Sequence, residues 1–267
     1  MNTIIYPMKV HAVKLEYRRL KLANMPHGSF KERRGKNTVV VTYDPDNPKA
    51  TPRCPSRLTT STKRGKEYAE KINCYLKLKQ EYDSLLNSWY AMYSFSPPKV
   101  KFPINQYYDP HQMNNEFFNK AVDRQGLYAP KNPTESDHGE LKSKNELFGA
   151  DLLKLMDIPF KYETAVDLPA IEETINPDYL INFYEIDRCS YLEILGMNDK
   201  TDYSVRTATK ITGFSKELYR PGKEVIYVHV YDKNNFDRDY FVSQVLSAFN
   251  DMIPDEALDW EPVSQVV

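Results

Sequence analysis

Hydrophobic and polar positions in the second half of the chain alternate with two distinct periods. Apolar residues at helical spacing predict helices over 141–156, 202–218 and 236–253. Short apolar and β-branched runs predict strands over 160–168, 176–184, 189–195 and 224–231. The fold class expected from residue 140 onward is therefore mixed α/β, in the order α-β-β-β-α-β-α. The last of these strands is apolar on both faces, as in a central strand.

The first third of the chain follows a different pattern. A helix is predicted from Val10 to Leu20, ending near 24–28, and a β-branched strand over 38–43. A basic turn at 31–36 precedes this strand, and its hairpin partner is expected near 49–54, after a second turn at 45–48. A long helix over 60–93 completes a helix–β-hairpin–helix arm.

The long helix carries a nearly heptad stripe of large side chains, interrupted by Lys79. Its members are Tyr68, Ile72, Tyr75, Tyr82, Leu86, Trp89 and Tyr93. Such a stripe is usually a packing seam. We expect it to pack on the first helix or on a second copy of the chain, which would make a homodimer.

Three segments follow from these patterns. The arm takes 1–95 and the α/β domain takes 138–255. Between them, 96–137 is rich in Pro, Asn and Tyr and is expected to be a linker with one short helix near 113–122.

Composition excludes several classes of protein. With 267 residues, 20 Tyr and 12 Phe, the chain can bury a core. Its 9 glycines form no GxGxxG or Walker-type loop. No apolar run is long enough for a membrane span, so no membrane partner is expected. The three cysteines lack CxxC spacing, which favours a cytoplasmic location.

Charge is distributed unevenly along the chain. Residues 1–80 hold 18 Lys and Arg but only 6 Asp and Glu, although the whole chain is close to neutral. The basic turn concentrates four of these charges, at Lys31, Arg33, Arg34 and Lys36. This pattern indicates a surface that contacts a polyanion such as nucleic acid, or else a solvated turn.

The two strands at 176–184 and 189–195 bring together two carboxylates. Folding them about the tip at Glu185–Asp187 gives a register in which opposing residue numbers add up to 371, so Asp178 lies opposite Glu193. Directly opposed side chains share one face of a sheet. Two carboxylates in an apolar strand pair repel each other, and a divalent cation between them would relieve that repulsion.

Three short motifs occur in order on these elements. They are Ser143-Lys144-Asn145-Glu146 at the start of a helix, Pro177-Asp178 before a strand, and Tyr191-Leu192-Glu193-Ile194-Leu195-Gly196 on the next strand. This arrangement resembles the core of the PD-(D/E)XK nuclease superfamily, in a prokaryotic and phage branch that also carries a basic helix–hairpin–helix arm. The resemblance covers roughly residues 138–253.

The resemblance implies a metal-dependent nuclease with Mg²⁺ or Mn²⁺ as cofactor. Asp178, Glu193 and the backbone carbonyl of Ile194 would be its metal ligands, and Glu146 would contribute from the neighbouring helix. The implied partner is nucleic acid, with DNA favoured over RNA.

One position departs from the family pattern. The motif lysine would fall at residue 195, which is a leucine. Some members move this lysine to a neighbouring helix, so Lys210 is the first candidate for its role and Lys144 the second. A non-catalytic DNA-binding protein on the same fold is the alternative, and a scaffold built on the long helix is a third reading.

Overall fold

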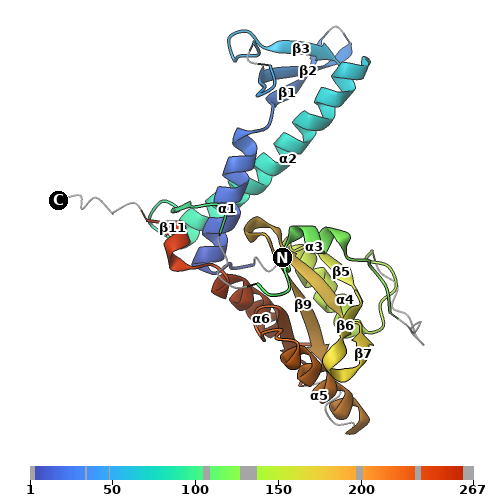
Figure 1. Ribbon diagram of the computed structural model, residues 1–267. Helices are drawn as coiled ribbons and strands as arrows, with labels where there is room; N and C mark the ends of the chain where they lie inside the picture. Colours follow the sequence, from blue (N-terminus) through green and yellow to red (C-terminus); the bar gives the residue numbers. More distant parts are fainter. Residues whose placement is uncertain are drawn as a thin grey trace, which may run out of the picture. The chain divides into compact units, whose positions relative to one another are not determined.

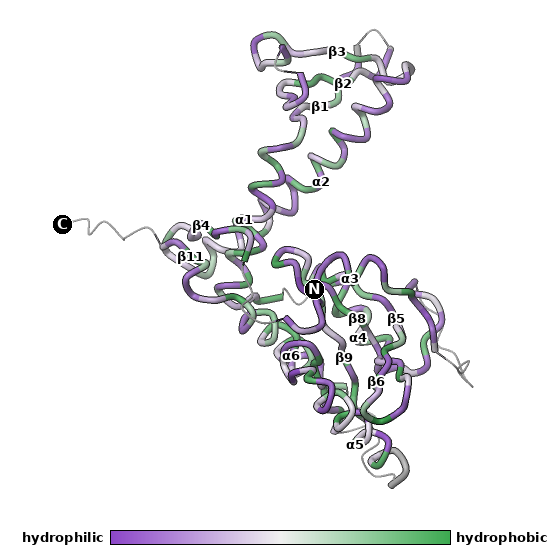
Figure 2. Tube along the Cα trace, viewed as in Figure 1, coloured by the Kyte–Doolittle hydropathy of each residue, from purple (hydrophilic) through white to green (hydrophobic). Residues whose placement is uncertain are grey.

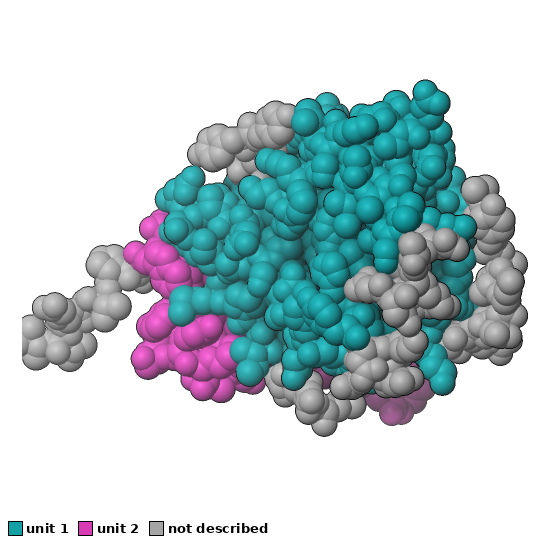
Figure 3. Space-filling view, turned by 90° about the horizontal axis from the view of Figure 1, so that it is seen from below, with its two compact units in different colours: residues 1–10, 101–258 teal, residues 11–100, 259–267 magenta. Residues whose placement is uncertain are grey.

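A computed structural model describes residues 4–33, 35–47, 49–104, 109–126, 137–196, 201–231 and 236–260. The chain divides into two compact units (Figures 1 and 3). Unit 1 contains residues 1–10 and 101–258, and unit 2 contains residues 11–100 and 259–267. The boundaries of these units lie at 10/11, 100/101 and 258/259, whereas the sequence predicted segments of 1–95, 96–137 and 138–255.

Unit 2 is built from two helices and a three-stranded antiparallel sheet. Helix α1 (Met8–Ala23) leads into β1 (His27–Arg33), β2 (Lys36–Tyr43), β3 (Ser56–Thr59) and the long helix α2 (Lys63–Met92). The sheet order is β1-β2-β3. The helix–hairpin–helix arrangement is as predicted, but its strands differ. The segment 31–36, expected to be a basic turn, contains the end of β1 at Arg33, the turn at Gly35 and the start of β2 at Lys36, and the third strand lies at 56–59 rather than 49–54.

The stripe on α2 is used partly within the chain. Tyr68 and Ile72 pack against Val39 and Val41 of β2. Further along, Trp89 is fully buried, with its ring edge-on to His11 of α1. Most of the helix is nevertheless hydrophilic (Figure 2), so its apolar positions are isolated. The seam therefore has partners inside unit 2, and dimerisation through it stays a prediction.

Unit 1 contains a four-stranded mixed sheet in the order β10-β9-β8-β5. Its strands are β5 (Phe160–Tyr162), β8 (Tyr179–Phe183), β9 (Arg188–Leu195) and β10 (Val225–His229). Strand β10 is parallel to β9, and the other pairs are antiparallel. With α4 (Lys144–Leu155), α5 (Thr201–Lys216) and α6 (Arg238–Asp251), the sheet follows the predicted order α-β-β-β-α-β-α.

Helices cover both faces of this sheet. Tyr179 and Ile194 face α4, which approaches so closely at Gly149 that a Cβ there would lie 3.1 Å from Ile194 Cδ1. On the opposite face, Leu180 and Tyr191 share a buried cluster with Phe214 of α5. Because side chains alternate along a strand, even positions of β8 and odd positions of β9 face α5.

The strand predicted over 160–168 is two strands in two different sheets. Strand β5 ends before Glu163, whose φ of +48° interrupts the extended backbone. The chain then forms a separate hairpin of β6 (Val166–Leu168) and β7 (Glu173–Ile175), joined by the short helix η1 (Pro169–Ile171). The apolar pattern runs through both strands, so it does not reveal the break.

The described parts of the segment predicted as a linker are packed into unit 1. Helix α3 (Asn115–Lys120) contributes Phe118, with Met113 just before it, to the cluster beneath the sheet. The prediction of a short helix near 113–122 is thus confirmed, whereas a linker running from 96 to 137 is not what the structure shows. Strands β4 (Lys99–Val100) and β11 (Leu258–Asp259) lie where the chain passes between units.

Two more short helices, η2 (Tyr184–Ile186) and η3 (Asp255–Ala257), complete the described elements. Helix η2 forms the predicted tip between β8 and β9, and Asp187 ends it in the left-handed region with φ of +55°. None of the described helices has the length and apolarity required to cross a membrane.

Candidate functional site

Asp178 lies directly before β8, where the predicted register holds. Tyr179 is opposite Leu192 in the sheet, so the next pair outward is Asp178 and Glu193. The Asp178 carboxylate accepts a hydrogen bond at Oδ2 from the backbone N–H of Ile194, at 2.6 Å. Its own carbonyl accepts from the N–H of Glu163. The start of β8 is therefore tied to β9 on one side and to the end of β5 on the other.

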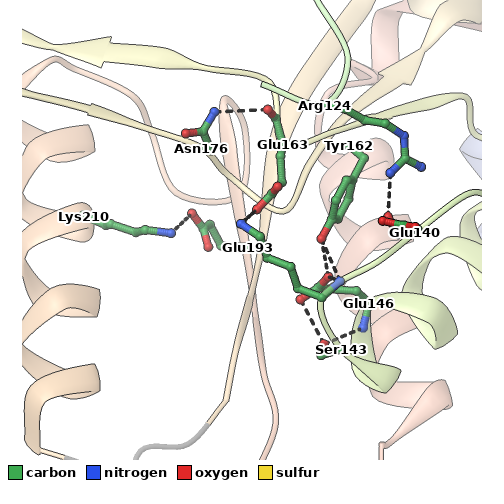
Figure 4. Close-up of polar contacts among 10 residues, drawn as sticks. Arg124, Glu140, Ser143, Glu146, Tyr162, Glu163, Asn176, Glu193 and Lys210 are labelled. Atoms are coloured by element: carbon green, nitrogen blue, oxygen red, sulfur yellow. Dashed lines mark hydrogen bonds and ion pairs between the residues drawn. The ribbon is translucent and has the colours of Figure 1, made fainter. Parts of the chain in front are cut away.

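Glu193 lies near the end of β9, flanked by β8 and β10, and is only 3% exposed. Its Oε1 accepts a hydrogen bond from Nζ of Lys210 on α5, at 2.8 Å (Figure 4). Leu195, two residues further along β9, is buried and shares the Glu193 face. The ammonium group beside Glu193 thus comes from α5, as expected for Lys210.

The surroundings of the two carboxylates raise the pKa of both. Burial and the neighbouring charge of Glu193 raise the pKa of Asp178 well above its usual range. Burial also raises the pKa of Glu193, and the Lys210 ammonium offsets only part of that effect. A pair of this kind is unfavourable while both members are ionised, unless a further positive charge approaches.

Glu146 has a different set of partners. Ser143 caps α4 by accepting from the N–H of Glu146, and its hydroxyl donates to Glu146 Oε1 at 2.9 Å. Oε2 accepts from the N–H of Lys142 at 2.8 Å and from the Tyr162 hydroxyl at 2.6 Å. Both oxygens of Glu146 are therefore engaged in holding the start of α4 against β5. The pattern Ser143-x-x-Glu146 is itself a sequence signal for such a cap.

Among the residues that the structure describes, no group of three or more His, Cys, Asp and Glu side chains is arranged to hold a metal ion. The three-carboxylate arrangement that the sequence predicts, with Glu146 as a member, is thus not formed in the described chain. The reason is visible in the packing. Helix α4 approaches the sheet on the Tyr179 and Ile194 face, whereas Glu193 faces α5.

Sequence reasoning missed an ion pair that borders the same site. Glu163 is 8% exposed, and its Oε1 forms a close contact with Nζ of Lys142. Asn176 donates its side-chain N–H to the Glu163 carbonyl at 3.1 Å (Figure 4). No sequence motif marks Glu163, because its position depends on the break after β5.

These side chains line one cavity of about 820 Å³ within unit 1. Its wall includes five carboxylates and two partnered lysines, with the exposed Lys144 and Arg206 also on its border. The carboxylates are Glu146, Glu163, Glu173, Asp178 and Glu193, and the partnered lysines are Lys142 and Lys210. The cavity combines buried negative charge with cations at two sides, which suits a ligand that carries both a cation and an anionic group.

The basic cluster of the arm belongs to unit 2. Lys31 is exposed on β1, and Lys36 is exposed at the start of β2. The backbone of Arg33 ends β1, while its side chain and all of Arg34 lie outside the described residues. Gly35, with φ of +70°, allows the tight turn between the strands.

The motif order and the geometry of Asp178, Glu193 and Lys210 are therefore what indicates a function. No family model, no curated protein and no solved structure matches this chain.

Proposed function

We propose that the chain is a metal-dependent nuclease that hydrolyses phosphodiester bonds of nucleic acid, with DNA as the favoured substrate. The observation that carries this proposal is the constellation of Asp178, Glu193 and Lys210 in one cavity. Two neighbouring carboxylates can bind a divalent cation, and a lysine beside them can offset the negative charge of a phosphate. The resemblance of the motif order to PD-(D/E)XK nucleases supports the same chemistry.

The donor set fits Mg²⁺ or Mn²⁺. Hard divalent cations prefer carboxylate and carbonyl oxygens, and Asp178, Glu193 and the Ile194 carbonyl would hold the ion. Burial raises the pKa of both carboxylates, so a cation beside them would stabilise their ionised forms. When bound, such an ion would lower the pKa of a water molecule and polarise the phosphate.

The residues of the chain have separate tasks in this proposal. Lys210, held at 2.8 Å from Glu193, offsets the negative charge of the phosphate as the bond to water forms and the bond to the leaving oxygen breaks. The leaving oxygen takes a proton that the attacking water loses and becomes a free hydroxyl. Lys142 and Lys144 on the cavity wall attract the phosphate backbone. Glu146 positions Tyr162 and the start of α4 instead of contacting substrate.

A non-catalytic DNA-binding protein on a nuclease-like fold is the second candidate. One observation favours it: Glu146 does not join the two carboxylates, so fewer acidic ligands are available than the resemblance implies. The two candidates differ in whether the purified chain cleaves nucleic acid.

The test is a cleavage assay on linear and circular DNA and on RNA, with Mg²⁺ or Mn²⁺ and with chelator. We expect metal-dependent cleavage that Asp178→Asn abolishes. Asp239→Asn, which removes an exposed carboxylate at the start of α6, is the matched control and should cleave normally. Binding without cleavage of any substrate would contradict the nuclease and establish the second candidate.

A further inference from the structure

The sheet of unit 2 has one face against α2 and one face turned away from it. Val39 and Val41 of β2 are on the α2 side, where they pack with Ile72. Gly28, opposite Val41, is on this side too, since a Cβ there would lie 2.9 Å from Ile72 Cδ1. Side chains alternate along a strand, so the even-numbered residues of β2 belong to the opposite face. We call this opposite face the outer face.

The strand register identifies the other residues of the outer face. Thr38 pairs with Lys31 on β1 and with Thr59 on β3, and Val40 pairs with Ser29 and Arg57. Lys36 pairs with Arg33. Among the residues whose side chains the structure describes, the outer face consists of Ser29, Lys31, Lys36, Thr38, Val40, Thr42, Arg57 and Thr59.

The composition of the outer face is one-sided. Three of these eight residues are Lys or Arg, four carry hydroxyl groups, and none is acidic. Glu32 pairs with Asn37 and so belongs to the α2 side. The outer face also has no aromatic residue. It is thus a cationic surface with hydroxyl donors and without stacking groups.

The charged groups of the outer face are accessible. Lys31, Lys36 and Arg57 are exposed, whereas Thr38 and Val40 of the middle strand are 8% and 6% exposed. Lys31 and Arg57 lie on β1 and β3, the two strands that flank β2. At the usual spacing between neighbouring strands, the axes of β1 and β3 are about 10 Å apart. Positively charged side chains on both sides of the buried middle strand can contact successive phosphates of a nucleic-acid backbone.

The start of α2 adds charge at the hairpin end of this sheet. The N–H of Thr60, just after β3, donates to the carbonyl of Asn37 at 3.1 Å, beside the turn between β1 and β2. Lys63 and Arg64 follow in the first turn of α2, and both are exposed. Basic residues from three segments of the sequence therefore gather at one end of unit 2.

We propose that the outer face binds the phosphate backbone of duplex nucleic acid without reading its sequence. Phosphates are contacted by Lys and Arg and by hydroxyl donors, whereas single strands are generally held through aromatic stacking, which this face cannot provide. The inference rests on the proposed function in one respect: the polyanion that the outer face binds is taken to be nucleic acid. Arg57, on the third strand, extends the site beyond the basic turn recognised in the sequence.

The experiment measures binding of the full-length chain to a fluorescently labelled duplex, in chelator so that no cleavage occurs. The variant is the double substitution Lys31→Gln with Arg57→Gln. Its affinity should fall on the order of tenfold for each phosphate contact that the substitutions remove, and the slope of log affinity against log salt should shrink by about 0.9 for each of them. Thermal melting of each variant verifies that the fold is retained.

The matched control is Lys77→Gln with Lys79→Gln, which removes the same charge from exposed positions of α2 beyond its contact with the sheet. The control should bind nearly as well as the unmodified chain. Three outcomes would overturn the inference. Binding could be weakened equally in both double variants, or it could be unchanged in the outer-face variant. The chain could also bind the corresponding single strand more tightly than the duplex. If the chain binds duplex through Lys31 and Arg57 but never cleaves nucleic acid, the proposed nuclease function is wrong and the inference about the outer face stands.

Discussion

Lys210 Nζ lies 2.8 Å from Oε1 of Glu193, so a residue of α5 is bonded to a carboxylate of the sheet 17 positions earlier in the chain. The pair is largely shielded from water, since the side chain of Glu193 is 4% exposed and that of Lys210 is 31% exposed. The contact places an ammonium group beside Glu193, on the strand face that the apolar Leu195 shares. Lys210 is therefore the residue whose removal tests the chemistry most directly.

Replacing Lys210 by alanine should lower cleavage on the order of 10²-fold or more, because one electrostatic donor to the phosphate is removed. Lys144→Ala should cost less, since Lys144 is exposed on the border of the cavity. Lys216→Ala removes an exposed lysine from the same helix and should leave cleavage unchanged. Single-turnover rates on DNA would measure all three. A silent Lys210→Ala together with a damaging Lys144→Ala would reverse the assignment.

Glu193→Gln should abolish cleavage and weaken binding of Mn²⁺, while the fold is retained. The substitution preserves shape but removes a charge that would hold the cation. Calorimetric titration with Mn²⁺ gives a readout independent of activity, and Glu140→Gln, at an exposed position, is the control. Unchanged Mn²⁺ affinity in the Glu193→Gln variant would exclude Glu193 as a ligand.

The metal-free chain should lose stability as pH rises, through Asp178 and Glu193. An acid whose pKa is raised by folding binds protons more tightly in the folded state, so its contribution is present at low pH and is lost as pH rises through the folded pKa. Each tenfold difference in proton affinity corresponds to about 1.4 kcal/mol.

Melting temperatures of the unmodified chain and of Asp178→Asn, in chelator at about pH 5 and about pH 8, would measure this effect. The variant lacks the raised pKa of Asp178, so it should gain stability relative to the unmodified chain at the higher pH. Added Mn²⁺ should reduce that difference by stabilising the unmodified chain. An advantage of Asp178→Asn that is larger at the lower pH would contradict the sign.

Glu146→Gln should affect stability more than catalysis. In glutamate, two oxygens accept hydrogen bonds from Ser143, Lys142 and Tyr162, whereas glutamine has only one such oxygen. The loss should lower the free energy of unfolding by about 1–3 kcal/mol. Cleavage by this variant should remain well above that of Glu193→Gln. Denaturant unfolding and the cleavage assay together measure both effects. A stable but inactive Glu146→Gln would restore Glu146 as a direct participant.

The local pattern of residues predicts much of unit 1. Alternation in 176–184 and 189–195, with a polar tip between them, is enough to predict the register in which Tyr179 lies opposite Leu192. Helical periods predict α4, α5 and α6, because amphipathic faces repeat over a few residues whatever the distant chain does. The pairing of Asp178 with Glu193 follows from that local information alone.

Tertiary structure decides the details of the site that depend on distant segments. Three side-chain contacts of the site join residues 16 to 21 positions apart: Glu163 with Lys142, Glu146 with Tyr162, and Glu193 with Lys210. The sequence thus determined which elements form, because periodicity is a local property. Which polar side chains meet was decided only by the packing of those elements against one another.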